Sequence, residues 1–521
     1  SGSEDDPEQS GSEDDPEQGE ESLPPTEGLE YTLSDDKSSY FVSGIGTATD
    51  TDIVILSTYE GLPVTTIGDG AFSTCTSLMG VTIPDSVTTI GDSAFEGCDS
   101  LTSVTMGDSV TTIGDGAFST CTSLTSVTIP DSVTSIGENA FSGCSSLESV
   151  TMPAIAIDYI PKINLKTVVI TSGESIGDNA FRGCSSLENV TISNGVASIG
   201  RGAFRDCTSL TSITIPFIGA AINGAENNHF GYIFGAVSGF ANCVRVPLSL
   251  KTVVVTGGES IDDYAFYDCD SLTSITILDS ATNVGEYAFY DCDSLTSITI
   301  PDKVTSIGEY AFSDCDSLTS ITIPDKVTSI GEYAFYDCSS LKSVTIGKGV
   351  TSIGRSAFVV GILGNSIIEI YNKSALAITA GEDDYSGLVW KAKNVYTQEG
   401  DSWFTDTPDG FRFFYDGNEK KGYLVGYSGS ETDITLPDGF IAYDGTLVTE
   451  YEIYEYAFYH CSNVTSVTIP NSVTGIGHRA FMNSTSLVRV TILGGVTEID
   501  YRAFYNLSLI HISEPTRLDV M

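Results

Sequence analysis

The chain has 521 residues, which is too long for one globular hydrophobic core, so it must divide into domains or extend by repetition. Its 70 acidic side chains outnumber its 23 basic ones and give a formal net charge of −47. Such a surface repels nucleic-acid phosphates and anionic lipid headgroups, which excludes both as partners. No apolar run reaches the roughly 20 residues that a membrane-spanning helix requires.

The first 27 residues form an acidic low-complexity segment. SGSEDDPEQ at Ser1–Gln9 recurs at Ser10–Gln18, and Leu23 is the only large aliphatic side chain before residue 28. Because such a stretch buries too little apolar surface to offset the entropy of ordering, we expect residues 1–27 to be a disordered acidic spacer.

The rest of the chain repeats a unit of 23 residues, which is most easily followed through an Ala-Phe dipeptide. The phenylalanines of this dipeptide are Phe72, Phe95, Phe118, Phe141, Phe181, Phe204, Phe266, Phe289, Phe312, Phe335, Phe358, Phe458, Phe481 and Phe504. A fixed period of this length is typical of solenoids, in which each repeat forms one coil and stacks on the next.

One unit, Cys121–Gly143, shows how a coil is built. Leu124–Ile129 reads L-x-x-V-x-I, a strand with its apolar side chains on one face. Pro130-Asp131 ends the strand, Val133–Ile136 is a second extended piece, and Ala140-Phe141 closes the coil with a helical or irregular turn. The sequence therefore predicts a β-rich leucine-rich repeat solenoid with one parallel strand sheet and short turns.

Two β-hairpin patterns indicate two solenoid segments, each with an N-terminal cap. The first pairs Tyr31–Leu33 with Tyr40–Val42, and the second pairs Phe411–Tyr415 with Tyr423–Tyr427. Each hairpin is followed by a T-D-I strand and then by the Ala-Phe turn.

The hairpins set the expected domain boundaries. We expect a first solenoid over residues 28–400, with an insert at 217–246, and a second solenoid over residues 401–509. Residues 510–521 do not continue the repeat, and we expect an irregular tail there and a natural protein that is longer than this chain.

The unit C-x-S-L-T-S-V-T-I-P-D-S-V-T-S-I-G-x-x-A-F resembles the BspA-like leucine-rich repeat family of bacterial surface proteins. The insert sequence HFGYIFGA and the LKTVVIT strand also resemble those of large secreted bacterial members. The resemblance implies extracellular adhesion to host proteins or to other cells. It brings no catalytic residue and no cofactor.

Ten of the 12 cysteines share one position of the first array, Cys461 takes the same position in the second, and Cys243 lies in the insert. C-x-x-C is absent and histidine is scarce, which argues against a zinc site. We interpret the cysteines as a buried ladder of small thiols between coils. Disulfides between neighbouring coils are the alternative.

A second row, of threonines, lies between the inward-facing strand residues and should therefore face outward. Thr276, Thr299 and Thr322 belong to it, and a serine row runs beside it. Threonine suits any exposed strand position, so the row has a purely structural interpretation. The functional alternative is a flat hydroxyl-bearing surface for a protein or glycan partner; ice binding is a further one.

Tyrosines and acids gather in the middle coils, where EYAFYDCDSL and its near copies recur. Tyr267 and Tyr290 lie beside Asp268 and Asp291 and could form a binding edge. Sequence drift between repeats at exposed loop positions explains these tyrosines and aspartates equally well. Calcium would need a spaced loop such as D-x-D-x-D-G, which is absent, so no metal is expected. Because the carboxylates recur in phase and no catalytic motif occurs, we expect no enzyme.

The insert is the main break in the repetition and is therefore the best candidate binding site. It contains His229, Phe230, Tyr232, Phe234 and Phe240 among many glycines. Phe230, Tyr232 and Phe234 would form one aromatic face if the chain were extended there. The alternative is that these rings pack back onto the solenoid.

These features together predict an adhesin or recognition module for host or cell-surface proteins, displayed outside the cell and monomeric. No cofactor, no nucleic-acid partner and no membrane insertion are expected of this chain. A structural spacer that binds nothing tightly, and a carbohydrate-binding module that uses the insert aromatics, are the alternatives.

Overall fold

A computed structural model describes residues 24–222, 224, 226–277, 280–359, 368–374, 376, 392–397, 404–416, 420–442, 445–459, 461–507 and 511–513. The chain forms two compact units, residues 1–171 (unit 1) and residues 172–521 (unit 2). The predicted acidic spacer falls almost wholly outside the described residues. The predicted segment boundaries at 28–400, 217–246 and 401–509 stay a proposal.

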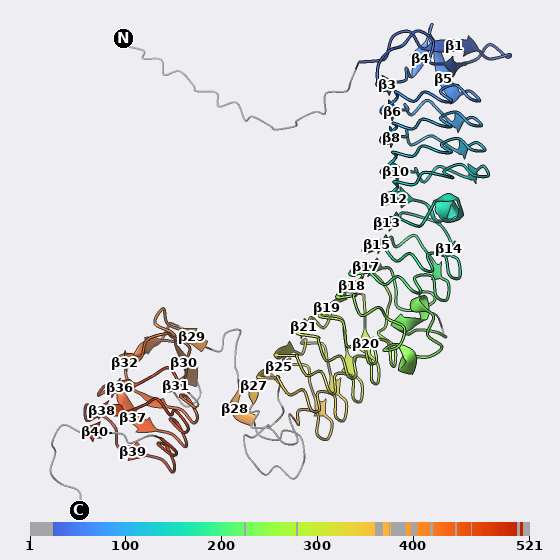
Figure 1. Cartoon of the computed structure of the whole chain (residues 1–521). Coiled ribbons are helices and arrows are strands. Elements are labelled where there is room, and N and C mark those ends of the chain that lie inside the picture. The colour runs from blue at the N-terminus through green and yellow to red at the C-terminus, as the bar shows by residue number, and fades with distance from the viewer. Residues whose placement is uncertain are drawn as a thin grey trace, which may run out of the picture. The chain divides into compact units, whose positions relative to one another are not determined.

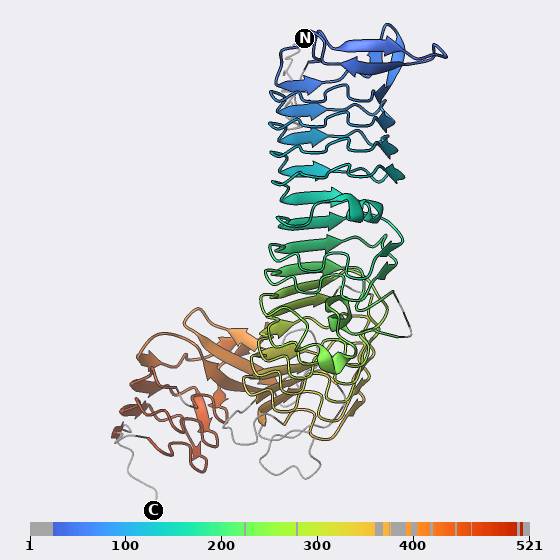
Figure 2. The same ribbon diagram turned by 45° about the vertical axis from the view of Figure 1, so that its right-hand side comes forward.

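Unit 1 is a stack of coils with one strand ladder on each of two sides (Figures 1 and 2). It begins with an antiparallel pair, β1 (Glu30–Leu33) and β2 (Tyr40–Gly44), and β2 pairs in parallel with β5 (Leu62–Ile67). The ladder of β5 continues through β7 (Thr89–Ile90), β9 (Thr112–Ile113) and β11 (Ser135–Ile136). The strands of the other ladder are β3 (Asp52–Val54), β6 (Gly80–Thr82), β8 (Ser103–Thr105), β10 (Ser126–Thr128), β12 (Ser149–Met152) and β13 (Thr167–Ile170).

Unit 2 repeats this design. Its long ladder contains β15 (Asn189–Ile192), β17 (Ser212–Ile215), β18 (Thr252–Val255), β19 (Ser274–Ile277), β21 (Ser297–Ile298), β23 (Ser320–Thr322), β25 (Ser343–Ile346), β27 (Ile368–Asn372) and β28 (Ala392–Thr397). The short strands opposite are β14 (Ser175–Ile176), β16 (Ser198–Ile199), β20 (Asn283–Val284), β22 (Ser306–Ile307), β24 (Ser329–Ile330) and β26 (Ser352–Ile353). The sequence predicts a single parallel sheet, and the ladder of short strands is an additional one.

The last coils of unit 2 start with an antiparallel sheet of β29 (Phe404–Asp406), β30 (Phe411–Asp416) and β31 (Lys421–Tyr427). Parallel strands follow on β31, namely β35 (Tyr451–Ile453), β37 (Val473–Ile476) and β39 (Glu498–Ile499). The second ladder here is β32 (Asp433–Thr435), β36 (Ser466–Ile469), β38 (Arg489–Ile492) and β40 (His511–Ser513), and β33 (Phe440–Ile441) pairs with β34 (Leu447–Val448). Their buried side chains form one hydrophobic cluster from Phe411 to Ala503.

Neighbouring coils pair in register, so that each residue lies on its counterpart in the next repeat. Ser126, Val127 and Thr128 face Ser149, Val150 and Thr151. The apolar strand residues are buried and the threonines between them are exposed or half-buried, which confirms the predicted inward and outward faces. Of the candidate threonines, Thr276, Thr299 and Thr322 are all exposed.

The Ala-Phe turn is also a ladder. The backbone N–H of Phe72 donates to the carbonyl of Ala94 at 2.7 Å, and Phe95 donates to Ala117 in the same way. The rings of Phe72 and Phe95 stack at 5.0 Å, and those of Phe95 and Phe118 at 5.1 Å. The repeat phenylalanines from Phe72 to Phe141 form one such column of buried rings in unit 1, and those from Phe266 to Phe358 form another in unit 2.

The cysteines of the repeats form the buried ladder that the sequence predicts, and none of them is joined in a disulfide. Nine of them are buried, while Cys75 and Cys461 are half-buried and Cys243 is exposed. The Cys98 thiol donates to the carbonyl of Phe72 at 3.1 Å, and this contact recurs at 26-residue separation in most coils. At the same repeat position Ser484 donates the equivalent hydrogen bond to the carbonyl of Phe458. The position therefore takes a small side chain that can donate a hydrogen bond.

No helix among the described residues is long and apolar enough to cross a membrane. The helical elements are three short 3-10 helices, η1 (Ala154–Tyr159), η2 (Phe230–Phe234) and η3 (Gly239–Ala241).

Substitutions at one inward and one outward position should differ strongly in their effect. Phe312 is fully buried between the rings of Phe289 and Phe335. Phe312→Ala leaves a cavity and should lower the free energy of unfolding by about 3–5 kcal/mol. Thr299→Ala, on the exposed row, should lower it by less than about 1 kcal/mol. Denaturant titration measures both, and equal losses would contradict the assignment of the two faces.

Thiol reactivity should follow burial. Burial raises the pKa of the Cys98 thiol to about 12, so it should react with an aromatic disulfide reagent only after unfolding. Cys243 is exposed and should react first, though more slowly than a free thiol, because hydrogen bonding to Asp268 raises its pKa to about 11. Mass spectrometry of the labelled native chain locates the modified residue, and early labelling of Cys98 would contradict the ladder.

Candidate functional site

The side of unit 2 formed by the Ala-Phe turns differs in chemistry from coil to coil, while the interior stays constant. We call this side, from the coil of Phe181 to the coil of Phe335, the turn edge. The residues two before and two after each Phe have positive φ there, for example Tyr287 at 54° and Asp291 at 56°. Left-handed backbone of this kind suits glycine and tolerates aspartate, but it is unusual for a bulky residue.

Two rows of tyrosines run along the turn edge. In the first, Tyr264, Tyr287, Tyr310 and Tyr333 stack with ring centroids 5.2, 4.8 and 4.8 Å apart. In the second, Tyr267 stacks on Tyr290 at 5.1 Å. The six tyrosines are half-buried. Because the planes of neighbours in each row differ by 10° or less, the ring faces that point toward a neighbour in the row are covered and the ring edges remain available.

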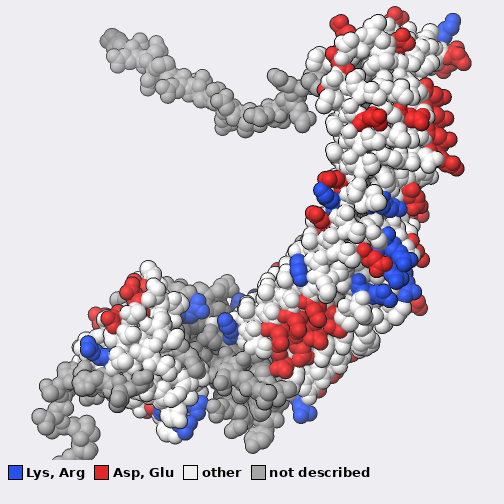
Figure 3. All heavy atoms as spheres, in the orientation of Figure 1, with Lys and Arg blue, Asp and Glu red and all other residues white. Residues whose placement is uncertain are grey.

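Aspartates crowd beside these tyrosines. A carboxylate oxygen from each of Asp270, Asp291 and Asp293 lies within 4.8 Å of the others. Partial burial, followed by repulsion from Asp268, raises the pKa of Asp270 to about 6. Burial and the repulsion of neighbouring aspartates, Asp293 foremost, raise the pKa of Asp291 to about 6. Figure 3 shows acidic side chains gathered over the coils around β21 and β25.

The insert is not an extended strand; it is a modified coil that continues the stack. Its η2 helix buries Phe230 and Phe234, and the Phe230 ring contacts that of Phe266 at 5.0 Å. Ile233 accepts the hydrogen bond from the Phe204 N–H, and the Phe230 N–H donates to Ala265. The aromatic face that an extended insert would present is therefore absent, and the packing alternative is the observed one for these two rings.

His229 and Tyr232 complete the predicted insert site. His229 is buried, its Nδ1 lies 3.2 Å from Asn242 Oδ1, and burial lowers the pKa of its imidazole. The Tyr232 ring meets the His229 ring edge-on at 6.2 Å and is half-buried. His229 thus holds the insert together and presents little surface to a ligand.

A different part of the insert carries its exposed apolar surface. Val237, Phe240 and Val244 are 73%, 58% and 74% exposed, and Leu248, just beyond the predicted insert, is 78% exposed. The Phe240 ring lies 4.6 Å from the Tyr264 ring and 5.1 Å from the Tyr267 ring. We call Phe240 together with the two tyrosine rows the aromatic ridge.

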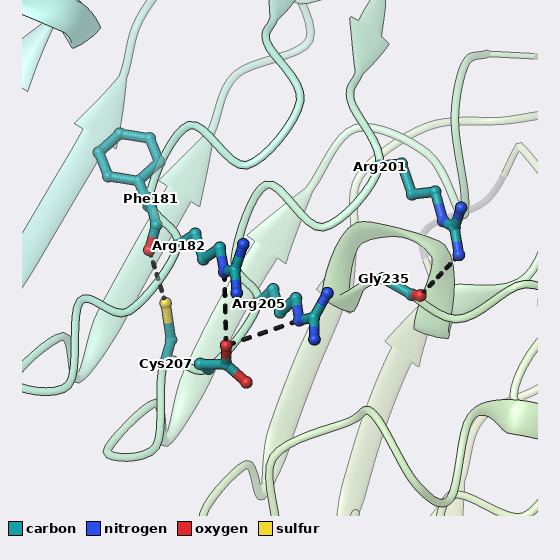
Figure 4. Close-up of polar contacts among 7 residues, drawn as sticks. Phe181, Arg182, Arg201, Arg205, Cys207 and Gly235 are labelled. Atoms are coloured by element: carbon teal, nitrogen blue, oxygen red, sulfur yellow. Dashed lines mark hydrogen bonds and ion pairs between the residues drawn. The ribbon is translucent and has the colours of Figure 1, made fainter.

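Arginines border the insert on its other side (Figure 4). Arg182 and Arg205 each approach one carboxylate oxygen of Asp206, at 3.6 and 3.5 Å, and Arg201 donates to the carbonyl of Gly235 at 3.2 Å. Arg182 and Arg205 directly follow a Phe of the repeat, as do Tyr267 and Tyr290. Arg201 therefore ties the insert to the preceding coil, and the row that Arg182 and Arg205 start changes to tyrosine beyond the insert.

The predicted site residues do not converge on one place. Tyr267 and Tyr290 lie on the aromatic ridge, His229, Phe230 and Phe234 are buried within the insert, and the candidate threonines lie on the strand face of the coils. Sequence reasoning noted Phe240 among the insert aromatics, and Tyr264 with its copies in later coils, but did not include them among the candidate site residues. The signal for that row was the 23-residue phase of its tyrosines, whereas no periodic signal distinguishes Phe240.

A family model described as "BspA type leucine rich repeat region" matches residues 58–163, 159–232, 259–373 and 451–521 in six copies. No curated protein matches the chain significantly. Solved structures do match. A leucine-rich repeat protein from Bacteroides ovatus is 25% identical, with 66% of this chain and 93% of that chain covered and a TM-score of 0.28.

Two further structures are similar. A leucine rich cell surface protein from Faecalibacterium prausnitzii is 28% identical, covering 70% of this chain and 96% of that chain, with a TM-score of 0.29. A leucine-rich repeat protein from Bacteroides capillosus is 33% identical, covering 24% of this chain and 92% of that chain, with a TM-score of 0.22.

The raised carboxyl pKa values predict a pH-dependent stability. The pKa values of Asp270 and Asp291 in the folded chain exceed the ordinary value of 3.8, so folding favours their protonated forms. The contribution of the two protonated carboxyls to the free energy of unfolding is complete below about pH 4 and is lost as the pH rises through about 6. Asp270→Asn with Asp291→Asn should therefore raise the melting temperature at pH 7.5 by more than at pH 4.5. Thermal melts at both pH values test this, and an equal offset would contradict it.

Proposed function

The chain belongs to the BspA-type leucine-rich repeat family, and from this premise we propose that it is an adhesin-type recognition module that binds proteins of a host or neighbouring cell. It acts outside the cell or on its surface and binds through the turn edge of unit 2. No catalytic step is proposed, because its carboxylates recur in phase with the repeat.

One observation carries the proposal: three exposed apolar side chains of the insert, Val237, Phe240 and Val244, lie within eight residues of sequence and Phe240 extends the tyrosine rows. Exposed apolar side chains that cluster mark interaction sites more often than scattered ones do. Tyrosine and phenylalanine are also enriched where proteins bind one another, since they supply large contact areas at low entropic cost.

The two alternative functions have weaker support. Carbohydrate-binding sites use the flat faces of aromatic rings, but stacking covers the faces between neighbours within the tyrosine rows, and Phe230 and Phe234 are buried. A passive spacer gives no reason for a large aromatic side chain, Phe240, to be exposed at a coil that breaks the repeat.

The test changes only exposed side chains, so that the buried rings of the insert stay in place. A variant with Val237→Ser, Phe240→Ser, Val244→Ser and Leu248→Ser should bind host cells or matrix proteins at least about ten-fold more weakly, as expected when a hot spot is removed. Its melting temperature should change little, because these positions are exposed.

A matched control removes four apolar side chains elsewhere. Met79→Ser, Ile155→Ser, Val488→Ser and Leu493→Ser lie at positions of 44–51% exposure and should leave binding within about two-fold of the unmodified chain. Surface plasmon resonance or cell binding by flow cytometry measures both variants. Equal binding by both would move the site away from the turn edge, with the threonine face as the next candidate.

A further inference from the structure

The aromatic ridge has a composition that the backbone alone does not favour. Tyr264, Tyr287, Tyr310 and Tyr333 have φ of 52–59°, where a bulky side chain costs of order 1–3 kcal/mol. The same position in unit 1 holds Gly70, Ser93, Gly116 and Asn139, which are small. Stacking returns roughly 0.5–1.5 kcal/mol per pair, so it offsets only part of the cost. The tyrosines therefore have a use at the surface beyond closing the turn.

The ridge is bordered by negative charge that the chain itself does not neutralise. Seven aspartates lie two or four residues after the repeat phenylalanine in four successive coils: Asp268, Asp270, Asp291, Asp293, Asp314, Asp316 and Asp337. Among the described residues, none of the ion pairs involves any of them. The nearby Lys251 directs its ammonium to the carbonyl of Ser271, 3.2 Å away. A cationic partner can satisfy these carboxylates.

The geometry of the rings narrows the kind of cation. Within a row the ring faces that point toward a neighbouring tyrosine are covered, so a partner reaches mainly the ring edges and hydroxyls, with the aspartates beside them. Long basic side chains fit this arrangement, because their aliphatic stems lie on apolar surface while their charged ends reach the carboxylates. The exposed Phe240 and Val244 at one end offer contacts to apolar residues of the same partner.

We propose that the aromatic ridge and its seven aspartates bind a basic polypeptide segment of a partner protein, in which Lys or Arg side chains pair with the carboxylates and apolar side chains contact Phe240 and the tyrosine edges. The inference rests on the proposed recognition function and names the chemistry of its partner. Four stacked coils accommodate roughly four or five residues of an extended chain at about 3.3 Å per residue. A calcium ion would use three of the carboxylates and leave the aromatic ridge without a role.

The experiment uses the full chain and three synthetic 12-residue peptides, with Leu at alternate positions and Lys, Gln or Glu at the others. Fluorescence anisotropy should show the Lys peptide binding at least about ten-fold more tightly than the Gln peptide, and less tightly as salt rises. The Glu peptide should not bind. Equal affinity for the Lys and Gln peptides would overturn the proposal.

Matched variants separate a local site from the general attraction of an acidic chain. Asp270→Asn, Asp291→Asn and Asp293→Asn should together weaken Lys-peptide binding about ten-fold. The control Asp50→Asn, Asp108→Asn and Asp302→Asn removes the same charge from exposed positions elsewhere and should change it less than about two-fold. Phe240→Ser should weaken binding without altering its salt dependence. Equal losses in the two triple variants would overturn the proposal.

Two more outcomes are informative. Micromolar calcium binding that is lost in the first triple variant, together with salt-insensitive peptide binding, would make the aspartates a metal site and overturn the proposal. Cell binding without discrimination among the peptides would refute only the basic partner. Discrimination among them by a chain that binds no cell or protein would refute the recognition function and leave the basic-peptide site standing.

Discussion

The hydrogen bond from the N–H of most repeat phenylalanines to the alanine carbonyl of the next coil holds the turns at one spacing, and much of the structure depends on it. Phe72, Phe95 and Phe312 donate at 2.7 Å in this way. The strands on the other sides of the coil pair at the same interval. Most coils therefore share the 23-residue period, although β18 and β19 still pair in register with Thr252 and Ser274 only 22 residues apart. The phenylalanine rings then stack at about 5 Å because no other spacing is available to them.

The same constraint divides the residues of each coil into two classes. Positions that point into the stack admit few substitutions, since each ring or methyl group lies on its copy in the next coil. Positions on the turn edge lie outside this core, so Arg182 and Arg205 can be replaced by Tyr267 and Tyr290 in later coils while the repeat phenylalanines stay unchanged. The side chains along the turn edge can therefore change without destabilising the core. A recognition surface can develop on this edge.

This division also explains what could be predicted from the sequence. The solenoid, the inward and outward faces and the thiol ladder follow from periodicity, and the structure confirms them. The hydrogen bond from Cys98 to Phe72 was not foreseen, because it joins residues 26 apart, which no local pattern reveals. The insert was harder still. Phe230, Tyr232 and Phe234 alternate as a strand would, but Gly235 has φ of 93° and the segment closes as a 3-10 helix, so the rings turn inward.

The insert shows how a solenoid can carry an irregular loop without interrupting the hydrogen-bond ladder between its coils. An interruption that simply separated two coils would leave a row of unpaired backbone groups on each side, and such edges invite aggregation. Here Ile233 accepts from Phe204 and Phe230 donates to Ala265, so the ladder passes through the insert. The residues beyond η2 are not needed for this pairing. They are free to expose Val237, Phe240 and Val244, and the contact of Phe240 with Tyr264 and Tyr267 places the exposed apolar surface at the end of the tyrosine rows. A binding surface can thus be added at a break in the repeat because the break preserves the ladder that stabilises the coils.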